Sequence, residues 1–214
     1  MSEWAVDRRT GSAAALHALP FPAPLTRTVW VLSVERPAIV LGSAQVAAGL
    51  APPPGVDVAR RRSGGGAVWL APGGTSWVDV FMPRGDRLWD DDVGRSALWL
   101  GELWAAAVGG GGGGGEAVVH RGPMVRTAHS AAFCFSGVAA GEVTVGAGGP
   151  KVVGISQRRT RAGARFQCVA YAEWAADPLA TALGITPAEV EHAGNGAGDL
   201  AALEAAFLAS LPTH

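Results

Sequence analysis

Arginine and glycine residues in one short segment have the chemistry of an anion-binding site. Three arginines, residues 60–62, run directly into Ser63 and Gly64–Gly66, and an apolar segment, Ala67–Leu70, follows. Arginine supplies a fixed positive charge and planar, bidentate donors for phosphate or carboxylate. Glycine lets a ligand approach the main chain, and successive N–H groups of such a turn form a concave anion site. The segment predicts a pocket for an anionic, phosphorylated small molecule; a solvated glycine hairpin is the alternative.

Known glycine-rich nucleotide motifs do not describe this segment. Neither the P-loop pattern G-x-x-x-x-G-K-[ST] nor the dinucleotide pattern G-x-G-x-x-G occurs in it. The segment must therefore be interpreted by its own order of residues.

Lysine occurs once, at Lys151, although the chain has 17 basic residues. Arginine thus supplies the solubilising charge, and a lone lysine marks a place where a compact ammonium suits better than a planar guanidinium. The alternative is an accident of composition. Lys151 begins a second segment whose residues could take part in chemistry, Lys151-Val-Val-Gly, which ends at Gly154.

Cysteine and histidine do not form a metal-binding pattern. Cys134 and Cys168 are not in a C-x-x-C pair, and the five histidines show no H-E-x-x-H spacing. We expect two free thiols and no structural metal.

Length and composition indicate one domain, residues 1–214. Hydrophobic residues make up 49% of the 214 and charged residues 16%, which is enough for a sizeable core. The net charge of −1 gives no global field for nucleic acid or an acidic membrane. Apolar runs are too short to span a bilayer, and the first residues lack the apolar core of a signal peptide. We therefore expect a cytoplasmic protein with neither nucleic-acid nor membrane partners.

Hydrophobic patterning predicts a chain of short strands with helices between and after them. Helices are expected near residues 12–17, from Asp90 to Gly109, and after Asp177, Thr186 and Asp199, with the glycine run 109–115 as a surface loop. The expected strands cover residues 27–35, 38–41, 56–59, 67–70, 76–82, 116–120, 142–145, 152–156 and 165–171.

The segment Arg60–Val68, Arg-Arg-x-Ser-Gly-Gly-Gly-Ala-Val, resembles the signature of the lipoate–protein ligase A and octanoyltransferase family. The Lys-x-x-Gly segment at Lys151 resembles a second family motif, and the resemblance covers roughly residues 27–185. It implies the catalytic fold shared with biotin–protein ligases. This is an α/β (α+β) single domain with a mixed, mostly antiparallel sheet and helices mainly on one side.

The resemblance implies an ATP-dependent acyl ligase. Lipoate or octanoate would form an acyl-adenylate with ATP, accompanied by Mg²⁺, and a lysine of a lipoyl domain would then take the acyl group. The acceptor would be a dehydrogenase E2 or the glycine-cleavage H protein. Lys151 would polarise the acyl carbonyl, and Arg60 or Arg61 would hold phosphate. The remaining binding residues implied by the motifs are Ser63, Gly64, Gly65, Gly66, Ala67, Val68 and Gly154, and Trp69, Val68 and Val153 are candidate walls of an acyl tunnel.

A cysteine mechanism competes with the ligase. Ala132–Phe135, with Cys134 seventeen residues before Lys151, resembles the nucleophile loop of some octanoyltransferases in the family. Octanoyl-carrier protein would acylate Cys134, and no ATP would be needed. The alternative is that Cys134 is a small buried apolar residue.

The sequence departs from the family at three places. Trp69 stands where many members have histidine, and Phe166-Gln167-Cys168 replaces a histidine-glycine pair. No accessory domain follows, which leaves room for a separate accessory subunit or for the transferase reaction. A non-catalytic paralogue that binds an acyl or adenylate ligand is a further alternative. The Gly-Arg-Gly-Arg run typical of biotin ligases is not seen, so a biotin ligase is the less favoured interpretation.

Overall fold

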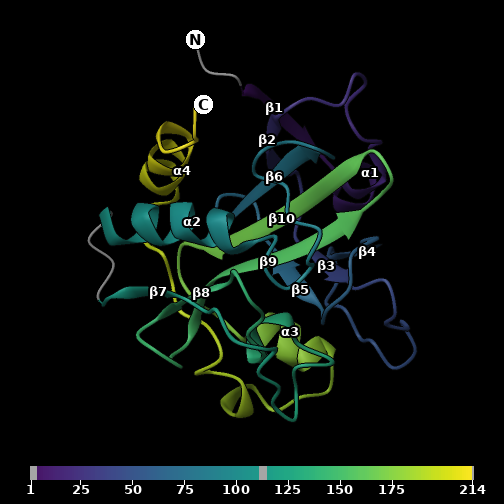
Figure 1. Ribbon diagram of the computed structural model, residues 1–214. Coiled ribbons are helices and arrows are strands. Elements are labelled where there is room, and N and C mark those ends of the chain that lie inside the picture. The colour runs from purple at the N-terminus through teal and green to yellow at the C-terminus, as the bar shows by residue number, and fades with distance from the viewer. Residues whose placement is uncertain (1–3, 111–114, 214) are drawn as a thin grey trace.

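Two sheets and two groups of helices make up the computed structural model, which describes residues 4–110 and 115–213 (Figure 1). The helices are α1 (Ala13–Ala18), α2 (Leu98–Gly110), α3 (Asp177–Ala182) and α4 (Leu200–Ala209), with short 3-10 turns η1 (Cys134–Ser136) and η2 (Pro187–Glu189). The strands are β1 (Ala5–Gly11), β2 (Thr28–Val34), β3 (Ala38–Leu41), β4 (Asp57–Arg60), β5 (Val68–Leu70), β6 (Thr75–Pro83), β7 (Ala117–Val119), β8 (Val143–Val145), β9 (Lys151–Arg159) and β10 (Gly163–Tyr171).

The large sheet has seven strands in the order β1-β2-β6-β10-β9-β8-β7. Only its β1–β2 pair is parallel, and the other neighbours run antiparallel. A small sheet has the order β4-β3-β5, with β3 parallel to β4 and antiparallel to β5. The mixed, mostly antiparallel architecture predicted for the chain is therefore confirmed.

The two longer helices, α2 and α4, cover one face of the large sheet together (Figure 1). Trp104 of α2 stacks on Phe207 of α4 with the ring centroids 4.0 Å apart. The opposite face packs against the small sheet, α1 and α3. Side chains of β6 alternate between these layers, with Trp77 and Phe81 on one side and Val78 and Val80 on the other. Both faces of β6 are buried because the sheet is covered on both sides.

The acidic run before α2 does not begin the helix, so the expected helix start at Asp90 is wrong. Residues 93–97 form turns, and α2 begins at Leu98. The carboxylates of Asp90 and Asp92 accept the backbone N–H groups two residues onward, those of Asp92 and Gly94. Asp90 also pairs with Arg95. Such local side-chain bonds compete with the helical pattern, so the run forms turns instead.

Strand β1 lies within an N-terminal region for which only a short helix was expected. Its side chains are mostly exposed, so it carries no hydrophobic alternation, and it joins the sheet through the parallel pairing with β2. Ser12 caps the short helix that follows by accepting the N–H of Ala15. The central residues of the predicted glycine loop, 111–114, lie outside the described part of the chain.

Candidate active site

The arginine–glycine segment forms a loop between β4 and β5, across the end of β3. The N–H of Arg61 donates to the Leu41 carbonyl at 2.9 Å, and that of Ser43 donates to the Ser63 carbonyl at 3.0 Å. These bonds hold the glycines at the rim of the small sheet.

Arg61 and Arg60 hold this loop from different sides. Arg61 is 4% exposed, and its guanidinium donates to the carbonyls of Gly64 at 2.8 Å and Gly66 at 2.7 Å. Arg60 points outward and donates to the carbonyls of Gly42 and Gln45. Both guanidinium groups thus fix backbone conformation, and their contact with a ligand phosphate stays a prediction.

The glycine loop packs directly against the segment that carries Cys134. A Cβ at Gly66 would lie 2.7 Å from the backbone nitrogen of Cys134, so only glycine fits there. The Ala67 N–H donates to the Ala132 carbonyl, and the Cys134 N–H donates back to the Ala67 carbonyl. The two predicted motifs are therefore joined by backbone hydrogen bonds, although 67 positions separate Ala67 from Cys134 in the sequence.

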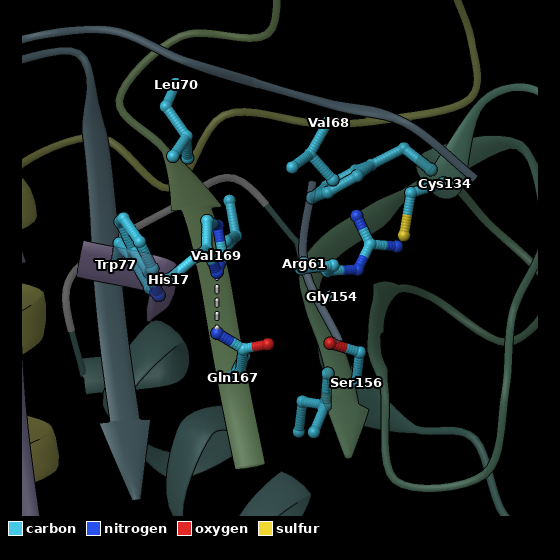
Figure 2. Close-up of a pocket in the computed structure, with 12 residues that line it drawn as sticks. His17, Arg61, Val68, Leu70, Trp77, Cys134, Gly154, Ser156, Gln167 and Val169 are labelled. Atoms are coloured by element: carbon cyan, nitrogen blue, oxygen red, sulfur yellow. Dashed lines mark hydrogen bonds between the residues drawn. The ribbon is translucent and has the colours of Figure 1, made fainter. Parts of the chain in front are cut away.

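A narrow pocket lies between this loop and strands β9 and β10 (Figure 2). Its walls are mainly apolar, and a few polar groups interrupt them. The lining residues are His17, Arg61, Val68, Leu70, Trp77, Cys134, Phe135, Gly154, Ile155, Ser156, Gln167 and Val169. An apolar cavity with a few convergent polar groups is the usual form of a small-molecule site.

Lys151 lies directly behind this pocket. It is the first residue of β9, directly before the strand expected at 152–156, and it is 1% exposed. Its ammonium donates to the Cys134 carbonyl at 2.9 Å and lies 2.7 Å from the Glu142 carboxylate. Phe135 covers it, with the ammonium 5.3 Å from the centre of the ring.

Glu142 is the partner of Lys151 that sequence reasoning missed. Its side chain is 4% exposed, and besides the ammonium it accepts the N–H groups of Ala139 at 2.7 Å and Ile155 at 3.0 Å. The carboxylate therefore fixes both the Lys151 side chain and the middle of β9. Nothing in the sequence distinguishes Glu142 from a solvated charge before a strand.

His17 and Gln167 are two further pocket residues that the sequence did not reveal. The Gln167 amide accepts from the Ser63 hydroxyl at 3.0 Å, and its nitrogen lies 3.2 Å from Nδ1 of His17. His17 also packs on Trp77, with the ring centroids 4.3 Å apart. Burial, followed by the charges of Arg165 and Arg61, lowers the pKa of His17 to about 3. The imidazole is therefore neutral at physiological pH.

The predicted site residues occupy several positions around the pocket. Arg61, Val68, Cys134 and Gly154 line it, and Ser63 reaches it through Gln167. The other predicted residues, Arg60, Gly64, Gly65, Gly66, Ala67 and Lys151, lie in the loop or behind the wall. Of the candidate tunnel walls, Val68 is in place, whereas Val153 points into the core beneath α2 and α4 and Trp69 borders the other core.

Cys168 is buried in the core, as expected, and burial raises the pKa of its thiol well above the usual range. Both cysteines are free. No helix among the described residues is long and apolar enough to cross a membrane.

The motif positions agree with a comparison to known protein families. A model described as the lipoyl protein ligase A/B catalytic domain matches residues 21–198. The chain belongs to this family. No curated protein matches the sequence.

Solved lipoate ligases share the fold of this family member at low sequence identity. A Thermoplasma acidophilum protein described as a lipoate protein ligase, with bound lipoic acid, is 14% identical with a TM-score of 0.66, covering 97% of this chain and 83% of its own. A bipartite lipoate protein ligase from the same organism is 13% identical with a TM-score of 0.68, at 98% and 82% coverage. A lipoate-protein ligase A bound with ATP is 14% identical with a TM-score of 0.66, at 97% and 83% coverage.

Proposed function

We propose that this chain is a cytoplasmic lipoate–protein ligase that activates lipoate or octanoate with ATP and transfers the acyl group to a lysine of a lipoyl domain. One observation carries the proposal. Arg61 of the arginine–glycine loop, Cys134 and Gly154 come from distant parts of the chain and line one mainly apolar pocket, with the Lys151 ammonium behind it. Such a site suits an apolar acyl chain that ends in a charged, reactive carboxylate.

The proposed reaction has two steps. A carboxylate oxygen of the acid attacks the α-phosphorus of ATP, forming acyl-adenylate and releasing pyrophosphate. The amine of the acceptor lysine then attacks the acyl carbonyl, loses a proton and displaces AMP. Both steps spread negative charge, which fixed donors in a water-excluding site stabilise.

The residues of the loop have separate roles in this proposal. Backbone N–H groups of Gly64–Gly66 face the phosphate and carboxylate, and Ser63, Ala67 and Val68 shape the wall beside them. Arg60 or Arg61 contacts phosphate, and Mg²⁺ enters with ATP, since this ion is usually held through phosphates and few protein ligands. The apolar walls hold the acyl chain at about 0.8 kcal/mol per buried CH₂.

Lys151 polarises the acyl carbonyl in this mechanism. Because Phe135 and Gly154 separate its side chain from the pocket, the Cys134–Phe135 segment must shift before the ammonium reaches the acyl group. The bond from Lys151 to the Cys134 carbonyl is the contact that must break.

The acceptor proposed for this chain is the lipoyl domain of a dehydrogenase E2 or the glycine-cleavage H protein. Support comes from the T. acidophilum neighbour, which is a bipartite ligase described with its E2 lipoyl domain. We propose that residues 1–214 act as a single catalytic domain, and that a separate accessory subunit takes part as in that neighbour.

Cys134 supports a second candidate function, an ATP-independent octanoyltransferase. Its side chain lines the pocket, and its sulfur lies 3.9 Å from the position of a Cβ at Gly65. The thiolate would attack the thioester of octanoyl-carrier protein and expel the carrier thiol. An acceptor lysine would then displace Cys134 from the new thioester.

Lipoate-dependent exchange of labelled pyrophosphate into ATP tests the ligase proposal. We expect exchange by the unaltered chain and by Cys134→Ser, and its loss in Lys151→Ala. Exchange that persists in Lys151→Ala would remove the proposed role of this ammonium. A hydroxylamine-sensitive octanoyl adduct on Cys134, formed without ATP, would instead favour the transferase.

A further inference from the structure

A buried hydrogen-bond donor without a partner lies in the wall of the pocket, on His17. The side chain is 7% exposed and lines the pocket, and its Nε2 has no hydrogen-bond partner among the described residues. Nearly all buried polar groups in proteins are paired, so an unpaired one in a ligand pocket points to a ligand atom.

The neighbours of His17 determine which ring nitrogen carries the proton. The Gln167 oxygen accepts from Ser63, so its nitrogen faces His17. An amide nitrogen only donates, and Nδ1 of His17 must therefore be the acceptor. The neutral ring then carries its proton on Nε2, the atom without a partner.

His17 lies at the end of the pocket away from the reactive groups. Figure 2 shows His17 and Trp77 on one side, and Arg61 and Cys134 on the other. An acyl group whose carboxyl end is near Gly154 and Cys134 would direct its tail toward the imidazole.

We propose that His17 is a specificity-determining residue that selects acyl chains whose far end carries a hydrogen-bond acceptor, which among eight-carbon acids favours lipoate over octanoate. This inference rests on the proposed function. A dithiolane sulfur is a weak acceptor that can take the Nε2 proton, whereas the methyl end of octanoate leaves it unpaired. A buried donor without an acceptor costs more free energy than one hydrogen bond contributes. The preference therefore comes mainly from the weaker binding of the plain alkyl tail, which leaves Nε2 unpaired.

Binding of lipoate and of octanoate to the full chain, measured by titration calorimetry, tests the proposal without requiring catalysis. We expect the unaltered protein to prefer lipoate, and His17→Leu to reduce that preference by roughly three- to ten-fold. His17→Gln keeps a donor of similar reach and should retain the preference. Leu70→Met is the matched control, because it reshapes another part of the wall without changing a polar group and should affect both acids alike.

A measurement on the unaltered protein covers the case in which His17→Leu does not fold. Proton–nitrogen correlation spectra should show His17 protonated at Nε2, with a resonance that shifts more on binding lipoate than on binding octanoate. Equal preference in His17→Leu and the unaltered protein, or a resonance that neither acid moves, overturns this inference alone. If neither acid binds the unaltered protein, the proposed function fails as well.

Discussion

Replacing Glu142 by glutamine should destabilise the fold through the buried charge of Lys151. The Glu142 carboxylate lies 2.7 Å from the ammonium, and the two side chains are 4% and 1% exposed. Glutamine keeps one carbonyl oxygen, which can still accept the N–H of Ile155. Its amide nitrogen would replace the oxygen that accepts from Lys151 and Ala139, so that donors face donors.

The expected loss is about 3–5 kcal/mol in the free energy of unfolding. That is the usual cost of removing one partner of a buried ion pair, because the remaining charge stays uncompensated. The Cys134 carbonyl is the one other hydrogen-bond acceptor of Lys151 among the described residues, and a neutral carbonyl cannot replace a carboxylate. Lys151→Met should cost a similar amount, since it leaves the carboxylate buried with only backbone donors.

Urea denaturation of Glu142→Gln, Lys151→Met and the double variant measures this effect. We expect the double variant to lose clearly less than the sum of the singles, with a coupling energy of about 2 kcal/mol. The reasoning would be refuted if Glu142→Gln lowered the free energy of unfolding by less than about 1 kcal/mol while the slope of that free energy against urea concentration stayed unchanged. That result would show that the pair is solvated or absent in solution.

Three further predictions follow from the loop and the pocket. Arg61→Ala should destabilise the protein by about 3 kcal/mol in urea titrations because it leaves the buried carbonyls of Val40 and Gly66 without this donor. Arg60→Ala, at an exposed position, should cost less than about 1 kcal/mol; equal losses would contradict this. Gly66→Ala should lower the free energy of unfolding by about 1–3 kcal/mol, since its Cβ would lie 2.7 Å from the backbone. Gly64→Ala places its Cβ in open space, and its free energy of unfolding should lie within about 1 kcal/mol of the unaltered protein. A tolerated Gly66→Ala would show that the close packing is absent. Because the pKa of His17 is lowered in the folded state, the unfolded state takes up the imidazole proton at a higher pH than the folded state does, from about pH 6.5 downward. Between pH 7 and pH 4 the free energy of unfolding should therefore fall by about 3 kcal/mol more in the unaltered protein than in His17→Leu. Parallel pH profiles of the two proteins would contradict this.

Sequence reasoning could predict the features that depend on local pattern. The β-strand periodicity of residues 76–82 and 165–171 and the arginine–glycine order placed the sheet and its loop correctly. The same reasoning placed a helix start at Asp90, which is wrong. The side chains of Asp90 and Asp92 accept hydrogen bonds from nearby backbone N–H groups and form turns there. The strand at Ala5–Gly11 was missed because its pairing, and not its side chains, puts it in the sheet.

Contacts between distant residues could not be predicted from the sequence. Glu142 acquires its role only because folding buries it against Lys151, and His17 meets Gln167 across 150 positions. The contacts of Arg61 with loop carbonyls are equally invisible in the sequence, where a run of arginines is typical of ligand binding or of a solvated edge. Burial and partnership of charged groups are properties of the tertiary structure, and the candidate site depends on both.

The central claim is that this chain attaches lipoate to a protein lysine through an adenylate. Its most direct test is the intact mass of an apo lipoyl domain after incubation with the chain in two reaction mixtures. One contains lipoate, ATP and Mg²⁺, and the other contains octanoyl-carrier protein without ATP. We predict a lipoyl mass gain on the acceptor lysine in the first mixture only. A gain only in the second mixture, or no gain with an acceptor that a known ligase modifies, would contradict the account.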